Sequence, residues 1–106
     1  FDAYGRDGAA VADQMNDLKN GGFKISQGAY QQLRDTYASG RASEDETSAA
    51  IKTYRAMHGE LLCPHSAVGV KVARELRNPE VPMITLATAH PAKFPAAVQK
   101  ASGIHP

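Results

Sequence analysis

A short polar corner near the C-terminal end of the sequence carries residue types that could do chemistry. Thr88, His90 and Lys93 supply a hydroxyl, an imidazole and an amine. The mostly apolar run at 82–87 precedes them and predicts a strand buried on both faces, while Pro95 after them is a favourable first residue for a helix. Because ligands of open α/β sheets bind at the carboxyl ends of strands, the corner is predicted to lie where a ligand is met.

A second candidate site follows Pro64, which can open a helix because its fixed φ fits the first helical position. His65 and Ser66 come next. Unpaired N–H groups and the helix dipole favour an anion at such a helix start. Ser66 can equally act as an ordinary helix cap. The residues alone leave these two interpretations open, with about equal weight.

Two blocks of the sequence resemble threonine synthase. Ala87–Phe94, with the sequence ATAHPAKF, resembles the C-terminal signature of that family, and Pro64–Gly69, with the sequence PHSAVG, resembles its Pro-His-(Thr/Ser/Ala)-Ala-Val segment. The blocks occur in the family's order and at about its spacing. The resemblance implies a fold-type-II pyridoxal-phosphate (PLP) enzyme that converts O-phospho-L-homoserine and water to L-threonine and phosphate. The family's Schiff-base lysine and phosphate-cradling loop lie in its N-terminal part, which nothing here matches. We therefore expect a C-terminal fragment that contains no catalytic residue and is inactive alone.

The resemblance also implies roles for individual residues. PLP acts as an electron sink, and the protein tunes it through the partner of its ring nitrogen. A hydroxyl in that place leaves the ring nearly neutral, and Thr88 matches the family's threonine with this role. Ala89, His90, His65 and Ser66 are predicted, less firmly, to line the cofactor site. Without the resemblance, a threonine at a strand end would more often simply bond to backbone.

Other interpretations of these residues are simpler. His90 can be a structural hydrogen-bonding residue, and Lys93, in a polar corner, a solvated lysine, since a Schiff-base lysine needs desolvation or a neighbouring cation. Cys63 stands where the family usually has an acidic residue, which puts in doubt any charge role at this position.

A metal site is the competing interpretation of the cysteine and histidines. Metal-ligand residue types occur at Cys63, His58, His65, His90 and His105. The Cys-x-His spacing is not that of structural zinc modules, and no second cysteine exists. The sequence therefore predicts no metal site.

The elements that must position these residues are mainly helices. Helical spacing and capping residues predict five of them, at about 8–20, from Ser26 to about 37, 43–58, 64–77 and 95–102. The strand at about 82–87 needs a partner, for which 23–25 and 61–62 are the only candidates in this chain. We expect a mainly α-helical α/β fragment covering 1–106, in which 1–60 is a helical region and 61–106 rejoins the PLP-binding large domain.

Composition bounds the remaining possibilities. The formal net charge is +1, and scattered Lys and Arg form no basic stripe for nucleic acid. No apolar run approaches membrane-spanning length. A single cysteine excludes an internal disulfide and suits the cytoplasm. The expected partners are the N-terminal part of the same enzyme and O-phosphohomoserine. The alternative is a small helical module whose 82–87 strand completes a partner protein's sheet.

Overall fold

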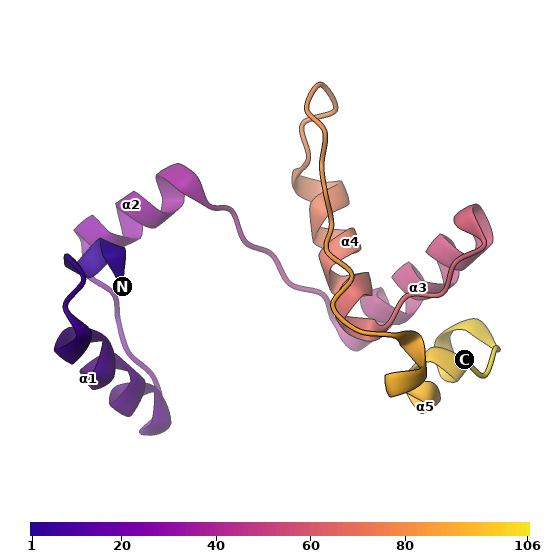
Figure 1. Ribbon diagram of the computed structural model, residues 1–106, viewed down its shortest axis with the longest axis horizontal. Coiled ribbons are helices and arrows are strands. Elements are labelled where there is room, and N and C mark those ends of the chain that lie inside the picture. The colour runs from indigo at the N-terminus through magenta and orange to yellow at the C-terminus, as the bar shows by residue number, and fades with distance from the viewer. The chain divides into compact units, whose positions relative to one another are not determined.

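The computed structural model describes residues 1–106, which divide into two units, Phe1–Ala38 and Ser39–Pro106. Helices account for all the regular secondary structure (Figure 1). The α-helices are α1 (Gly8–Lys19), α2 (Gln27–Thr36), α3 (Glu44–His58), α4 (Pro64–Leu76) and α5 (Pro95–Ser102), and the short 3-10 helices are η1 (Asp2–Tyr4) and η2 (Pro91–Lys93). The five predicted helices are thus confirmed.

The N-terminal unit contains η1, α1 and α2, and each of its two α-helices begins at a capping side chain. The Asp7 carboxylate accepts hydrogen bonds from the first N–H groups of α1, and the Ser26 hydroxyl caps α2 in the same way. The Tyr4 hydroxyl accepts the Ser26 N–H at 3.1 Å, which ties η1 to the start of α2. The link at 23–25 has no regular structure, so it is a linker and not a bridging strand. Ala29 is the only buried residue of this unit.

The C-terminal unit is built on α3, which packs against both α4 and α5. Ile51 of α3, Cys63, Ala67 of α4 and Val98 of α5 are each at most 1% exposed. The Ser43–Glu46 capping box starts α3, and Gly59 in the left-handed conformation ends it. These local signals fix where α3 begins and ends, and the four buried side chains fix what it packs against.

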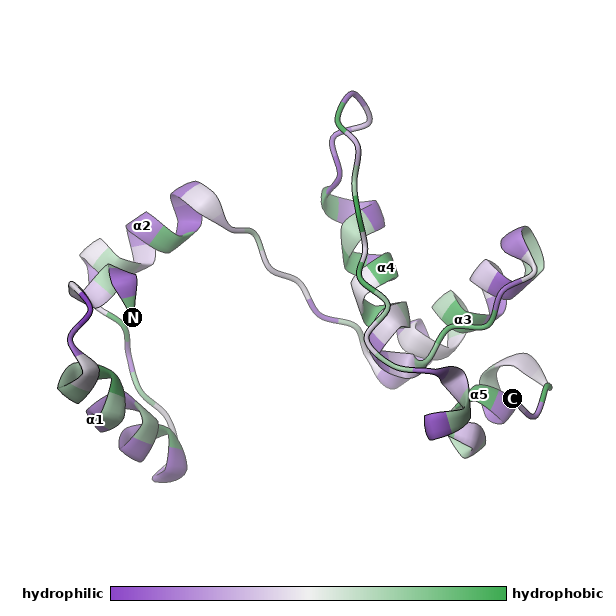
Figure 2. Cartoon of the chain, viewed as in Figure 1, coloured by the Kyte–Doolittle hydropathy of each residue, from purple (hydrophilic) through white to green (hydrophobic).

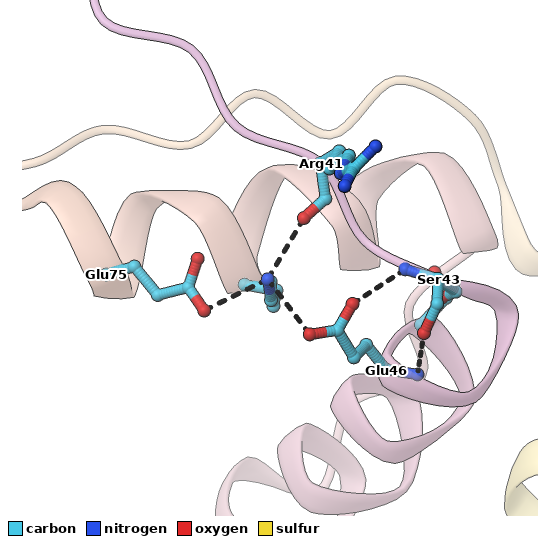
Figure 3. A network of polar contacts seen from close by, with 6 residues as sticks. Arg41, Ser43, Glu46 and Glu75 are labelled. Atoms are coloured by element: carbon cyan, nitrogen blue, oxygen red, sulfur yellow. Dashed lines mark hydrogen bonds and ion pairs between the residues drawn. The ribbon is translucent and has the colours of Figure 1, made fainter.

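An ion-paired lysine joins α3 to α4 on the surface (Figure 3). The Lys71 ammonium lies 3.3 Å from a Glu46 oxygen, 3.0 Å from a Glu75 oxygen and 3.0 Å from the Arg41 carbonyl. The hydrogen bond with Glu75 is the largest influence that raises the pKa of Lys71 above its ordinary value. The Ser43 N–H, followed by Lys71, lowers the pKa of Glu46. Both shifts favour the charged pair.

The prediction of a buried strand at 82–87 is wrong. The segment forms no strand and runs extended beside α4 (Figure 1), with apolar residues along it (Figure 2). The side chains of Met83, Ile84 and Leu86 are 49%, 83% and 76% exposed. A strand requires a neighbour whose backbone groups complete the ladder, and neither 23–25 nor 61–62 forms one. The chain therefore folds as helices plus an unpaired extended segment, not as a sheet.

No helix has both the length and the apolar character needed to cross a lipid bilayer.

Candidate functional site

A concavity of about 420 Å³ lies where the residues before α4 meet the segment that leads into η2. It is lined by Leu61, Leu62, Cys63, Ser66, Ala87, Thr88, Ala89, His90 and Pro91. Four of the five residues predicted to bind a cofactor, Ser66, Thr88, Ala89 and His90, therefore lie on one surface. The fifth, His65, is not part of this lining.

The start of α4 is capped by Cys63 rather than by Ser66. Pro64 occupies the first helical position, and the Cys63 sulfur accepts the Ser66 N–H at 3.4 Å. The interpretation of Ser66 as an ordinary helix cap is therefore wrong, because the residue sits inside the first turn, where its side chain is free to make other contacts.

A cluster of three short polar side chains, Cys63, Ser66 and Thr88, forms the floor of the concavity. The Ser66 hydroxyl oxygen lies 3.2 Å from the Cys63 sulfur and 3.4 Å from the Thr88 hydroxyl oxygen, and it accepts the Thr88 N–H at 3.1 Å. The Cys63 sulfur and the Thr88 hydroxyl are 3.9 Å apart. Cys63 is 1% and Ser66 3% exposed, whereas Thr88 is exposed. The cluster thus connects the buried start of α4 to an exposed residue that lines the concavity.

The cluster also lowers the pKa of the Cys63 thiol. Burial raises the pKa of Cys63, but hydrogen bonds from the Ser66 side chain and backbone, from Thr88 and from the His65 backbone outweigh burial, so the net pKa is lower than usual. Hydrogen bonds to a thiolate stabilise it. The sequence marks Cys63 as a departure from the family pattern and as a metal-ligand residue type, but it gives no sign of the contacts with Ser66 and Thr88.

The two histidines near the concavity make local contacts. His90 caps η2, since its Nδ1 accepts the Ala92 N–H at 3.2 Å. The His65 ring lies against Phe94 with ring centroids 4.7 Å apart. Lys93, at the end of η2, is exposed. His90 therefore shapes the wall of the concavity, while His65 joins α4 to the residue that precedes α5.

A second concavity, of about 340 Å³, is lined in part by residues of the 83–87 segment and shares Leu62, Ser66 and Ala87 with the first. Tyr54, Arg74 and Arg77 contribute to its lining. The Arg74 guanidinium lies 5.9 Å from the Tyr54 ring centroid, and the His58 ring is tilted at 45° to the same ring with centroids 4.5 Å apart. This group of side chains was not foreseen, although its residues recur at helical spacing on α3 and α4.

No three His, Cys, Asp or Glu side chains come together in a way that could hold a metal ion.

Comparisons with known proteins show what this chain is similar to. The family model described as "Threonine synthase, C-terminal" matches residues 66–106. The chain is 43% identical over 103 residues to the threonine synthase of Pseudomonas aeruginosa, covering 95% of this chain and 22% of that protein. It is 35% identical over 111 residues to the threonine synthase of Corynebacterium glutamicum, covering 100% of this chain and 23% of that protein.

Solved structures agree with the sequence comparisons. PLP-bound threonine synthase from Brucella melitensis superposes with a TM-score of 0.86 at 50% identity, over 100% of this chain and 23% of that chain. Yeast threonine synthase superposes with a TM-score of 0.74 at 35% identity, over 89% of this chain and 20% of that chain. The chain therefore spans about a fifth of the length of the proteins it matches.

Proposed function

We propose that this chain, which corresponds to the C-terminal portion of a threonine synthase, supplies one wall of the PLP site of that enzyme. The full-length protein would convert O-phospho-L-homoserine and water to L-threonine and phosphate. The Brucella relative is described as PLP-bound, which supports PLP as the cofactor of the full-length protein. When bound, PLP supplies the electron sink for the reaction.

The position of Thr88 is the observation that carries this proposal. Thr88 is an exposed residue that lines the 420 Å³ concavity beside Ala89 and His90, and no carboxylate and no lysine lines that surface. A neutral hydroxyl can donate one hydrogen bond to a pyridine nitrogen but offers no negative charge to stabilise a protonated ring. The donor set thus fits a PLP ring nitrogen that stays nearly neutral.

The other predicted residues fit this proposal unequally. Ser66, Ala89 and His90 line the same concavity as Thr88. Ser66 holds Thr88, and the small Ala89 side chain leaves room beside it. His65 has the weakest support, since its ring contacts Phe94 and lies off the lining. We propose for His65 a structural role at the start of α4.

The lysine that carries PLP is proposed to lie in the rest of the enzyme. A nucleophilic lysine needs a lowered pKa, whereas ion pairing raises the pKa of Lys71, and Lys93 is exposed. We therefore propose that the chain is inactive alone and that its partner is the N-terminal remainder of the protein. The exposed apolar residues of 82–87 would then be covered by that remainder.

A binding module that completes an unrelated partner's sheet is the other candidate, and the unpaired 82–87 segment would suit it as well. The matches to threonine synthases across 95% or more of the chain favour the enzyme. A cytoplasmic location, as expected from the sequence, is part of the same proposal.

The test uses the full-length protein and phosphate release from O-phosphohomoserine. Thr88→Ala should lower turnover and change the absorbance of the bound cofactor, Thr88→Ser should restore most of both, and Thr88→Asp should differ from both because a carboxylate favours a protonated ring. Thr85→Ala, in the same segment but outside the 420 Å³ concavity, is the matched control. Parent-like behaviour of all three Thr88 variants would remove Thr88 from the site.

A further inference from the structure

The Ser66 hydroxyl has more neighbours than an isolated helix serine needs. Its oxygen accepts the Thr88 N–H at 3.1 Å, and it also lies 3.2 Å from the Cys63 sulfur and 3.4 Å from the Thr88 hydroxyl oxygen. Ser66 is 3% and Cys63 1% exposed. At that burial the partners of these groups are one another rather than solvent, and every buried polar atom of this kind is satisfied.

Counting protons favours one direction of hydrogen bonding through this cluster. A hydroxyl has one proton to donate and two lone pairs that accept. The Thr88 N–H uses one lone pair of Ser66, and the Cys63 thiol, when it donates, uses the other. The single Ser66 proton then goes to the Thr88 oxygen. Inside the cluster the only acceptor left for the Thr88 proton is the Cys63 sulfur, 3.9 Å away and at the limit of a sulfur hydrogen bond, so a closer acceptor in the 420 Å³ concavity would take that proton.

We propose that Ser66 and Cys63 are positioning residues that orient the Thr88 hydroxyl so that it presents its proton, rather than a lone pair, to the ring nitrogen of PLP. This inference rests on the proposed role of Thr88 as the ring-nitrogen partner. Neither Ser66 nor Cys63 needs to touch the cofactor. Ser66 fixes both the backbone and the side chain of Thr88 through one oxygen, and Cys63 decides which way the Ser66 proton points.

The reverse order of donors would have the opposite effect. If Ser66 donated to the Cys63 sulfur instead, the Thr88 proton would be drawn back to Ser66, and Thr88 would show a lone pair to the concavity. A lone pair would suit a protonated ring nitrogen. The orientation of the cluster is therefore a way to select the neutral ring.

The experiment uses the full-length holoenzyme loaded with PLP that carries ¹⁵N in its ring. The ¹⁵N chemical shift reports hydrogen bonding at that nitrogen, and equilibrium dialysis gives the PLP dissociation constant. We expect Thr88→Ala to move the resonance toward that of a pyridine without a hydrogen bond. Ser66→Ala should move it in the same direction and weaken PLP binding by about threefold to tenfold, the worth of one neutral hydrogen bond.

Two comparisons separate positioning from a general structural role. In the Thr88→Ala background, Ser66→Ala should cause no further shift, since Ser66 acts through Thr88. Cys63→Ser should match the parent because serine keeps a donor, whereas Cys63→Ala should give a smaller shift than Ser66→Ala. If Ser66→Ala fails to fold, the comparison of Cys63→Ser with Cys63→Ala still tests the positioning role. The thermal unfolding midpoint of each variant controls for stability.

The outcomes distinguish this inference from the function it rests on. An unchanged resonance in Thr88→Ala overturns the ring-nitrogen role of Thr88 itself. A shifted resonance in Thr88→Ala with a parent-like Ser66→Ala leaves that role intact and overturns the positioning by Ser66. Equal resonances for Cys63→Ser and Cys63→Ala overturn the part assigned to Cys63.

Discussion

Two segments, α3 and 82–87, pack against α4. This chain buries the contact that α3 makes but leaves the 82–87 segment largely exposed. The α3 contact buries Ile51 and Ala67 and is joined at the surface by Lys71. The 82–87 segment is anchored just after its end, where the Thr88 N–H donates to Ser66, and it leaves Ile84 83% exposed. The difference indicates that the helices of the C-terminal unit stabilise one another, whereas the segment that leads into the candidate site keeps most of its apolar side chains uncovered.

The largest predicted effect is a loss of stability when the packing of α3 is disrupted. Ile51→Ala removes a side chain that is 1% exposed and should destabilise the full-length protein by about 2–5 kcal/mol. Met57→Ala, on the same helix but 63% exposed, should change stability by less than about 0.5 kcal/mol. Chemical denaturation measures both. Equal losses for the two variants would show that α3 does not form the core of this unit.

A substitution in the exposed 82–87 segment should leave the fold of this chain intact and weaken association instead. Ile84→Ser should leave the helical content of the isolated chain unchanged, because Ile84 is already exposed in it. It should weaken association with a separately produced N-terminal remainder by about tenfold or more, since burying such a side chain is worth roughly 1.5–3 kcal/mol. Isothermal titration of the two pieces gives the affinity. Unchanged affinity would mean that the remainder does not cover 82–87.

Two glycines allow the same comparison at single residues, because one faces a side chain of the packed helices and the other faces the exposed segment. A Cβ added at Gly40 would lie 2.8 Å from a Val72 methyl, whereas one added at Gly69 would lie 3.3 Å from the Thr85 methyl. Val72 is held in the packed unit, so Gly40→Ala should cost about 1–3 kcal/mol. The exposed Thr85 segment can yield, and alanine is the better helix former, so Gly69→Ala should be nearly neutral. Thermal denaturation distinguishes the two variants. An unchanged stability in Gly40→Ala would contradict the close approach of Gly40 to Val72.

The smallest effect concerns the surface ion pairs. The pKa of Glu46 is lower than its ordinary 4.5 in the folded chain, so its contribution is complete above pH 4.5 and is lost as pH falls through the folded pKa. Glu46→Gln should therefore flatten the loss of stability below that pH and leave the 82–87 side untouched. Denaturation midpoints at several acidic pH values test this, and an unaltered acid dependence would mean that the pair adds nothing.

Local signals explain why the helices were predictable from the sequence. Asp7, Ser26 and Ser43 each cap the helix that follows them, and Gly59 and Gly103 each end one in the left-handed conformation. Each signal acts over a few residues, so neighbouring residues suffice to recognise it. The strand failed for the complementary reason. Its apolar pattern was real, but pairing depends on a neighbour that residues 1–106 do not contain.

The sequence identified individual residues of the site but not the contacts between them. Ser66 and Thr88 were identified from separate blocks, and their contact joins residues 22 apart in sequence. His65 was expected beside Ser66, yet adjacent helical residues point about 100° apart, which turns the His65 ring toward Phe94. Cys63 was missed as a cap because serine, threonine, aspartate and asparagine are the usual capping residues.

The central claim is that Thr88 of this chain is the partner of the PLP ring nitrogen. A crystal structure of the full-length protein with PLP tests it most directly. We predict a distance of about 2.7–3.2 Å between the Thr88 hydroxyl oxygen and the ring nitrogen, with Ser66 still bonded to Thr88. A ring nitrogen held by any other residue, or PLP bound away from the concavity between Leu61 and Pro91, would contradict the account.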